Sequence, residues 1–147
     1  MTTTLAGVTD QDCIFCGIIA GEVPATLIHE DDRTVAFMDI QPATRGHALV
    51  IPRRHATDLL DIADDDLAAC AATAQRVAGL AMRNLGADGV NLVNACGPAA
   101  WQTVFHFHLH VVPRYADDPA RDDLQLPWIP TPGDPDVIAS AARELGR

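Results

Sequence analysis

Three histidines alternate with large apolar residues in the stretch HFHLHVVPR, and a neutral imidazole can act as a metal ligand or as a nucleophile. Side chains at every second position of a β-strand point to the same face, so His106, His108 and His110 are predicted to share one face. Pro113 is predicted to end the strand pairing, because proline has no N–H to donate. The face that anchors this strand to the core is predicted to comprise Phe105, Phe107, Leu109 and Val111.

Three interpretations of this histidine strand are open. The histidines could be the ordinary polar face of a half-buried strand, or all three could bind one metal ion. Parallel imidazoles converge poorly on a tetrahedral ion, which weakens the second interpretation. The third is covalent catalysis, in which one ring nitrogen is held as a donor, for example to a backbone carbonyl, and the other attacks.

A second motif, Cys13-Ile14-Phe15-Cys16, has the spacing of one half of a structural zinc site. A thioredoxin-like redox motif would follow a strand, whereas this one stands at the start of the chain. Uncoordinated cysteines packed in the core are the other alternative. We expect no disulfide framework, because the sequence carries no export signal.

The elements that must position these residues indicate an α+β fold. The sequence predicts a five-stranded antiparallel sheet with a long helix packed on one face, and short helices near both ends of the chain. The other face of the sheet is expected to be free for a ligand or a partner. The expected strands are two within 25–39 and one each at 47–52, 90–94 and 104–112, and the expected helices are 64–86 and 136–145.

Length and charge limit the function further. The 147 residues suit one domain, with residues 1–11 expected to be flexible and residues 116–147 forming a C-terminal extension. The net charge of -10 disfavours nucleic acid as a partner. No apolar run approaches the roughly 20 residues of a membrane span, and no signal peptide is recognisable, so we expect a cytoplasmic protein.

The histidine stretch fits the signature His-φ-His-φ-His-φ-φ, where φ is apolar, and resembles the histidine-triad (HIT) superfamily. DCIFCGIIAGEVPATLIHEDDRTVAFMDIQPATRGHALVIPRRH and NACGPAAWQTVFHFHLHVVPR are similar to its Hint-like (protein kinase C-interacting protein-like) bacterial branch. The resemblance implies a nucleotide hydrolase or transferase that acts on purine nucleoside phosphoramidates or dinucleoside polyphosphates. It also implies release of a nucleoside monophosphate such as AMP, and a homodimer.

By position, the resemblance makes His108 the nucleophile that attacks the α-phosphorus and forms a nucleotidyl-imidazole intermediate, which water then hydrolyses. His110 is expected to hold the α-phosphate and to offset its charge as an imidazolium. His47 is expected to be a buried histidine that supports the site through hydrogen bonds.

The substrate-binding positions that the resemblance implies are Asp39 for the ribose hydroxyls, Ile40 for the base pocket, and Asn94, Gln102 and Thr103 as donors to the phosphate or leaving group. A turn or capping role is the alternative for Asp39, and a turn role for Asn94. Strict alternation along the strand places Gln102, and not Thr103, on the histidine face, so Thr103 is expected to reach the phosphate only if the strand begins with a twist or bulge.

The resemblance also completes the zinc site, with His55 and His106 joining Cys13 and Cys16 as ligands of a structural zinc ion. His106 is then structural and carries no proton in the reaction.

Trp101 departs from the family pattern, which usually has glycine at this position. A tryptophan there could reshape the loop or cover the leaving-group cleft. It leaves open the alternative of a nucleotide-binding regulatory protein with weak or no catalysis.

Overall fold

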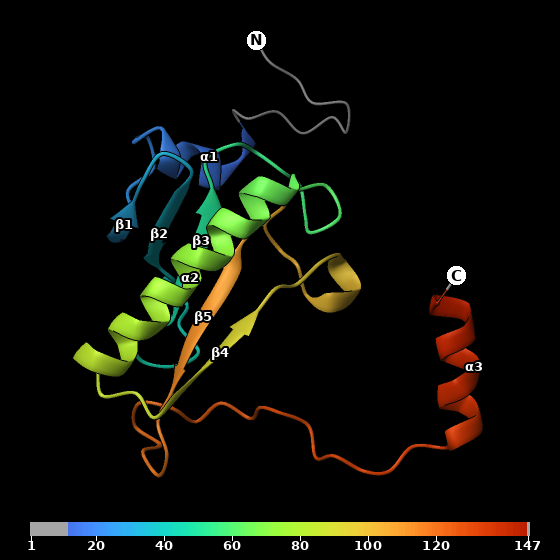
Figure 1. Ribbon diagram of the computed structural model, residues 1–147. Coiled ribbons are helices and arrows are strands. Elements are labelled where there is room, and N and C mark those ends of the chain that lie inside the picture. The colour runs from blue at the N-terminus through green and yellow to red at the C-terminus, as the bar shows by residue number, and fades with distance from the viewer. Residues whose placement is uncertain (1–11, 147) are drawn as a thin grey trace.

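The computed structural model describes residues 12–146, so the expected flexibility of residues 1–11 concerns a segment outside the described part. Five strands form one sheet in the order β1-β2-β3-β5-β4, and every neighbouring pair is antiparallel (Figure 1). The elements are α1 (Ile14–Ile19), β1 (Leu27–Glu30), β2 (Thr34–Met38), β3 (Ala48–Pro52), α2 (Asp64–Asn84), β4 (Gly89–Val93), the 3-10 helix η2 (Pro98–Ala100), β5 (Leu109–Arg114) and α3 (Pro135–Leu145). The predicted α+β fold is confirmed.

The core has two parts, one on each face of the sheet. Helix α2 lies across one face (Figure 1), where Cys70, Ala74 and Val77 pack against Val50 and Val111. The opposite face is not entirely free, because α1 packs on it. The cluster there is formed by Cys13, Phe15, Val35, Phe37, Leu49 and Ile51.

Strand β5 begins later than the sequence predicts. Residues 104–108 are irregular, because the main chain there leaves the sheet and Phe107 N–H donates to the carbonyl of Ala56 at 2.7 Å. Phe107 and Val111 are buried as predicted, whereas Phe105 is 40% exposed. Pro113 does not end the strand, because β5 continues to Arg114 alongside β4 while its pairing with β3 stops at Val111. A proline removes only one donor, so it interrupts at most one of the two ladders of a strand.

The first turn of α2 contains a buried carboxylate. Asp66 is 6% exposed and accepts bonds from Arg54 Nε at 2.8 Å and from Arg33 Nη2 at 2.9 Å. The bond from Arg54 is the main cause of a lowered Asp66 pKa; burial opposes it and the bond from Arg33 adds to it. These pairs join α2 to the ends of β2 and β3.

Asp66→Asn is expected to lower the free energy of unfolding by about 1–2 kcal/mol at pH 7, because an amide replaces the ionised acceptor. Since the pKa is lowered by folding, this stabilisation is present above the unfolded carboxyl pKa of about 4 and is lost as pH falls through the folded value. Urea unfolding at pH 7 and at pH 3 measures both effects. Asp64→Asn, exposed in the same turn, is the control, and equal losses for the two variants would contradict the assignment.

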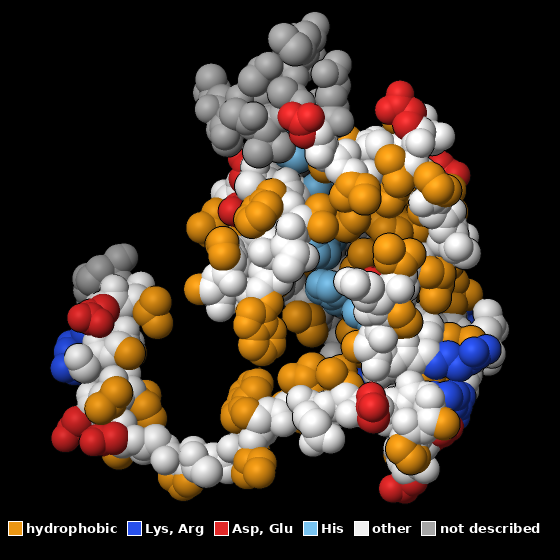
Figure 2. All heavy atoms as spheres, turned by 180° about the vertical axis from the view of Figure 1, so that it is seen from behind, with side chains coloured by type: hydrophobic (Ala, Val, Ile, Leu, Met, Phe, Trp, Pro, Cys, Tyr) orange, Lys and Arg blue, Asp and Glu red, His pale blue; other side chains and the backbone are white. Residues whose placement is uncertain are grey.

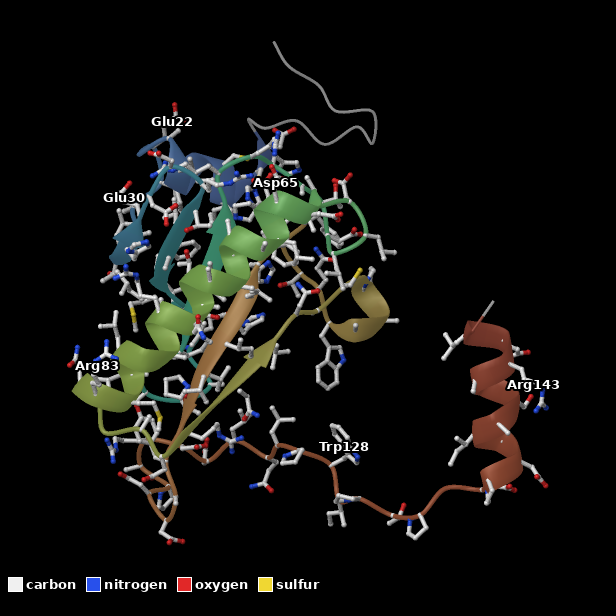
Figure 3. All side chains as sticks on the ribbon, in the orientation of Figure 1. Glu22, Glu30, Asp65, Arg83, Trp128 and Arg143 are labelled. Atoms are coloured by element: carbon white, nitrogen blue, oxygen red, sulfur yellow. The ribbon has the colours of Figure 1, made fainter. Side chains whose placement is uncertain are left out.

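The C-terminal extension runs away from the sheet and ends in α3, which stands apart from the other elements (Figure 1). Every described residue from 135 to 146 is exposed. Trp128, 78% exposed, projects from the stretch between the sheet and α3 (Figure 3). Among residues 12–146, no helix has the length and apolar content that spanning a membrane requires.

Candidate active site and metal centre

The tautomer of His108 is determined by a backbone carbonyl. Its Nδ1 lies 2.8 Å from the carbonyl oxygen of His106, and because a carbonyl can only accept, Nδ1 carries the proton. The neutral ring therefore has its lone pair on Nε2. Burial lowers the pKa of His108, and the bond to His106 opposes this only in part, so the neutral form is favoured.

A backbone amide determines the tautomer of His110 through a second histidine. Ala43 N–H donates to His47 Nδ1 at 2.9 Å, so the proton of neutral His47 is on Nε2. His47 Nε2 lies 2.9 Å from His110 Nδ1 and donates to it. His110 consequently carries its proton on Nε2, where it can donate to a ligand.

Burial also favours the neutral form of these two rings. It lowers the pKa of His47, against the attraction of Asp39. It lowers the pKa of His110 to about 4, with further contributions from His108 and His47 and an opposing one from Asp39. In the free protein, a neutral His110 can therefore act as a hydrogen-bond donor through Nε2, and the imidazolium expected beside the phosphate stays a prediction.

A cavity of about 280 Å³ opens onto these histidines on the α1 face of the sheet. In the view from behind, histidine side chains lie in the middle of this face and hydrophobic side chains surround them (Figure 2). Wider hollows of about 530 and 620 Å³ are more open to solvent, and the first adjoins this cavity because Met38 and Asp39 line both. The lining includes His108, His110, Thr103, Asp39, Ile40 and the apolar residues Ile14, Phe15, Ile18, Phe37 and Leu49.

The residues expected to bind the nucleoside line this cavity. Asp39 Oδ1 accepts the amide of Gln41 at 2.8 Å, which is the turn role considered as an alternative. Its Oδ2 lies 3.4 Å from His47 Nε2. Ile40 is 93% exposed at the cavity rim. The Asp39 carboxylate thus both holds the turn through Gln41 and lines the cavity.

The structure reverses the expected places of Gln102 and Thr103. Gln102 is buried, and its Nε2 donates to the carbonyls of Thr57 at 2.8 Å and Val104 at 3.1 Å, so the side chain braces the loop and does not line the cavity. Thr103 lines the cavity instead. Alternation was the wrong basis because residues 102–108 are not in a strand.

Asn94, directly after β4, is placed behind the cavity. Its Nδ2 donates to the carbonyl of His108 at 3.0 Å. Its Oδ1 is buried and has no hydrogen-bond partner among residues 12–146. The contact that the structure gives Asn94 is therefore to the main chain of His108.

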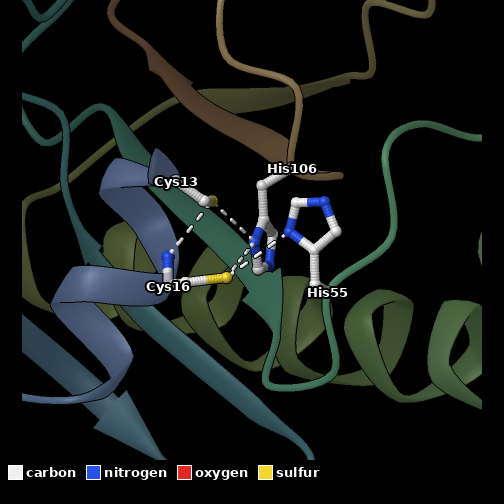
Figure 4. Close-up of side chains that lie close together, drawn as sticks. All are labelled: Cys13, Cys16, His55 and His106. Atoms are coloured by element: carbon white, nitrogen blue, oxygen red, sulfur yellow. Dashed lines mark hydrogen bonds between the residues drawn. The ribbon is translucent and has the colours of Figure 1, made fainter. Parts of the chain in front are cut away.

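The four expected metal ligands come together from three parts of the chain (Figure 4). His106 Nδ1 lies 3.3 Å from Cys13 Sγ and 3.5 Å from Cys16 Sγ, and His55 Nδ1 lies 3.4 Å from Cys16 Sγ. Tetrahedral zinc with sulfur and nitrogen ligands requires sulfur–nitrogen separations of about 3.5 Å. His106 Nε2 donates to the carbonyl of Pro52 at 2.8 Å, which leaves Nδ1 available to an ion. The donor set therefore fits zinc.

Comparison with known proteins agrees with this arrangement. A family model described as the HIT domain matches residues 20–117. This chain belongs to the HIT family. An uncharacterized HIT-like protein of Mycobacterium tuberculosis is 50% identical over 101 residues, which cover 69% of this chain and 70% of that protein. The protein hit of Bacillus subtilis is 35% identical over 128 residues, covering 78% of this chain and 88% of that protein.

Two crystal structures of HIT proteins resemble the fold. A zinc-bound histidine triad family protein from Mycobacterium smegmatis has a TM-score of 0.72 at 46% identity, with 79% of this chain and 86% of that chain covered. A histidine triad nucleotide-binding protein from Candida albicans has a TM-score of 0.77 at 31% identity, with 91% and 94% covered. The zinc-bound relative and the Cys/His cluster together suggest that this HIT protein binds zinc.

A second cluster, formed by Asp39, His47 and His110, also has metal-ligand residue types within 4.8 Å of one another. Its hydrogen bonds argue against a metal ion. The amide of Ala43 occupies His47 Nδ1, so Nε2 keeps its proton and cannot bind an ion. In this HIT chain His106 and His47 are thus distinguished by the group at the far ring nitrogen, which is a carbonyl acceptor at His106 and an amide donor at His47.

Sequence reasoning missed the contact between the two motifs. The ring of Phe15, inside the CxxC, packs edge-to-face against His108 with centroids 5.2 Å apart. The signal was present, because a metal shared by the CxxC and His106 must bring the residues between the cysteines close to the triad. The role of Ala43 depends on a backbone amide and has no signal in residue type.

Proposed function

We propose that this protein hydrolyses purine nucleoside phosphoramidates and releases a nucleoside monophosphate such as AMP. The observation that carries the proposal is the bond from His108 Nδ1 to the carbonyl of His106, which leaves a neutral Nε2 with a free lone pair in a nucleoside-sized cavity. A buried neutral imidazole is the form of histidine that can attack phosphorus.

In the first step, His108 Nε2 attacks the α-phosphorus, the P–N bond breaks, and the departing amine takes up a proton from solvent, which the water of the second step replaces. Water then attacks the nucleotidyl-imidazole, the bond from phosphorus to Nε2 breaks, and AMP leaves. Overall, one water molecule is added across the P–N bond. His110 Nε2–H donates to a phosphoryl oxygen and so stabilises the charge that develops there.

The cavity suggests a role for each residue around a bound nucleotide. Asp39 would accept ribose hydroxyl protons through lone pairs not used by Gln41, and Ile40 would cover the base. Thr103 would donate to the phosphate, while Gln102 and Asn94 would act from behind by holding the loop and the main chain of His108. His47 would keep His110 in its donor tautomer.

The charge of the cavity favours phosphoramidates over dinucleoside polyphosphates. Asp39 is the charged side chain among the described cavity residues, and these include no lysine or arginine. A polyphosphate chain would bring several negative charges into a protein of net charge -10 without a cation to offset them. A phosphoramidate presents about one negative charge at the reacting phosphorus.

We assign zinc a structural role at Cys13, Cys16, His55 and His106. Bound there, the ion would supply a cross-link between α1, the segment after β3 and the approach to β5. Because the carbonyl of His106 accepts the proton of His108, this cross-link would also fix the orientation of the nucleophile.

The enzymatic proposal is tested with adenosine 5′-phosphoramidates and chromatographic detection of AMP. We expect AMP release from phosphoramidates and much slower release from diadenosine tetraphosphate. Calorimetric binding of AMP with no turnover of any phosphoramidate would favour the regulatory alternative. Trp101 no longer supports that alternative, because it does not line the cavity and is 88% exposed.

We also propose a homodimer that forms through β4, the last strand of the sheet. Leu92 and Val93 are 50% and 38% exposed on this edge strand, and a shallow hollow beside it is lined by alanines of α2. An exposed apolar edge strand pairs readily with a second copy, and a twofold axis satisfies both edges.

Light scattering is expected to give roughly twice the chain mass of 15.7 kDa. Leu92→Lys is expected to give the monomer, because it places a charge in the interface. Leu60→Lys, at an exposed position in the loop before α2, serves as the control. A dimer that survives Leu92→Lys would place the interface elsewhere.

A further inference from the structure

Trp101 occupies a position that is unfavourable for tryptophan. It follows η2 with φ 71° and ψ 26°, in the left-handed region that bulky side chains rarely adopt and that glycine adopts freely. Its side chain is 88% exposed, so the indole is not part of the core. Neither the backbone nor the packing of the described residues requires an indole at this point.

The loop that carries Trp101 is held on both sides. Gln102 N–H donates to the carbonyl of Gly97 at 3.1 Å, and the Gln102 side-chain oxygen accepts Gly97 N–H at 2.8 Å. The amide nitrogen of the same side chain bonds to the carbonyls of Thr57 and Val104. The backbone is thus fixed, and the indole retains only two side-chain torsions, so little entropy is lost when it makes a contact.

The backbone of Trp101 lies close to the end of the nucleoside cavity that Thr103 lines. Thr103, which lines the cavity with His108 and His110, follows Trp101 by two residues, and two residues span at most about 7 Å. Trp101 itself is not among the lining residues. With the α-phosphate at Thr103, as proposed above, the part of a substrate nearest to Trp101 is the group attached beyond the α-phosphorus, which is the leaving group.

We propose that Trp101 is a specificity-determining residue that stacks on a planar aromatic leaving group. This inference rests on the proposed phosphoramidate hydrolysis and specifies which phosphoramidates are preferred. An indole face binds a flat aromatic ring by offset stacking, which a saturated ring of similar size cannot reproduce. The contact lies away from the reacting atoms, so it selects substrates without taking part in bond breaking.

The test compares two adenosine phosphoramidates, one of 2-phenylethylamine and one of 2-cyclohexylethylamine. Trp101→Gly is expected to lower kcat/KM for the phenyl substrate about tenfold and for the cyclohexyl substrate by less than about threefold. Trp101→Phe is expected to restore most of the preference. Because glycine suits the left-handed backbone, the glycine variant should keep a melting temperature close to that of the wild type.

A binding measurement separates this inference from the reaction itself. Trp128→Phe leaves Trp101 as the sole tryptophan of the chain, and His108→Asn in the same protein keeps the substrate intact. The phenyl compound is expected to quench the fluorescence of Trp101 and the cyclohexyl compound is not. Wild-type turnover of neither compound would defeat the proposed hydrolysis, whereas quenching would still support stacking. Turnover of both with an unchanged ratio in Trp101→Gly, or equal quenching by both, would overturn the role of Trp101.

Discussion

His108→Asn is expected to lower the turnover of an adenosine phosphoramidate by about a thousandfold or more, since it removes the nucleophile. The asparagine amide can still donate to the carbonyl of His106, so the fold and the binding of AMP should persist. Single-turnover kinetics measure the loss of chemistry, and calorimetry with AMP measures binding. A wild-type protein quenched in alkali, in which a phosphorus–imidazole bond survives, should carry a nucleotidyl group on the peptide that contains His108.

The matched control is His29→Asn. His29 lies on β1, where its Nε2 pairs with Asp31 at 2.9 Å, and it does not line the cavity. We expect its turnover to equal that of the wild type. Comparable activity in His108→Asn and His29→Asn would show that the nucleophile is another group.

Cys13→Ala is expected to abolish zinc binding and to lower the melting temperature by about 10 °C. Cys13 Sγ contacts His106 and also accepts the N–H of Cys16, so its loss removes one ligand and loosens the start of α1. An ion whose dissociation constant is a thousandfold below its free concentration adds about 4 kcal/mol to the free energy of unfolding. For a chain of this size, that corresponds to roughly 10 °C in the melting temperature. Elemental mass spectrometry and calorimetry, with and without a chelator, measure both quantities.

Cys96→Ala provides the control for this experiment. Cys96 is half-buried in the loop after β4 and is not one of the four clustered ligands. It is expected to retain one zinc per chain and a nearly unchanged melting temperature. Wild-type protein that is purified without chelators and contains no zinc would remove the structural role proposed for the ion.

The loss of zinc is also expected to affect turnover. The backbone carbonyl of His106 holds the proton of His108, while the side chain of the same residue belongs to the metal cluster. Loss of zinc is therefore expected to reduce kcat more than it weakens AMP binding. Reduced AMP binding with unchanged kcat would indicate that the cluster acts on the cavity by another route.

Much of the fold was predictable because it depends on local patterns. The glycine- and proline-bounded apolar run before Arg53 became β3, and the acidic start and apolar stripe at residues 64–86 became α2 almost to the residue. The alternating histidines and the CxxC spacing indicated His106, His108, His110, Cys13 and Cys16 as candidates, whereas the resemblance to the HIT family added His55 and the choice of His108 as the nucleophile. These features depend on residue type and short spacing, which a sequence states directly.

The tertiary structure decided what depends on backbone groups from distant segments. The carbonyls of His106 and Pro52 and the amide of Ala43 assign the proton on each ring, and a sequence does not show where such groups lie. Thr103, and not Gln102, lines the cavity, because the segment is anchored to the loop after β3 and alternation does not apply. The sequence by itself determined which side chains could act, while the fold determined their protonation and direction, because those depend on contacts between residues far apart in the chain.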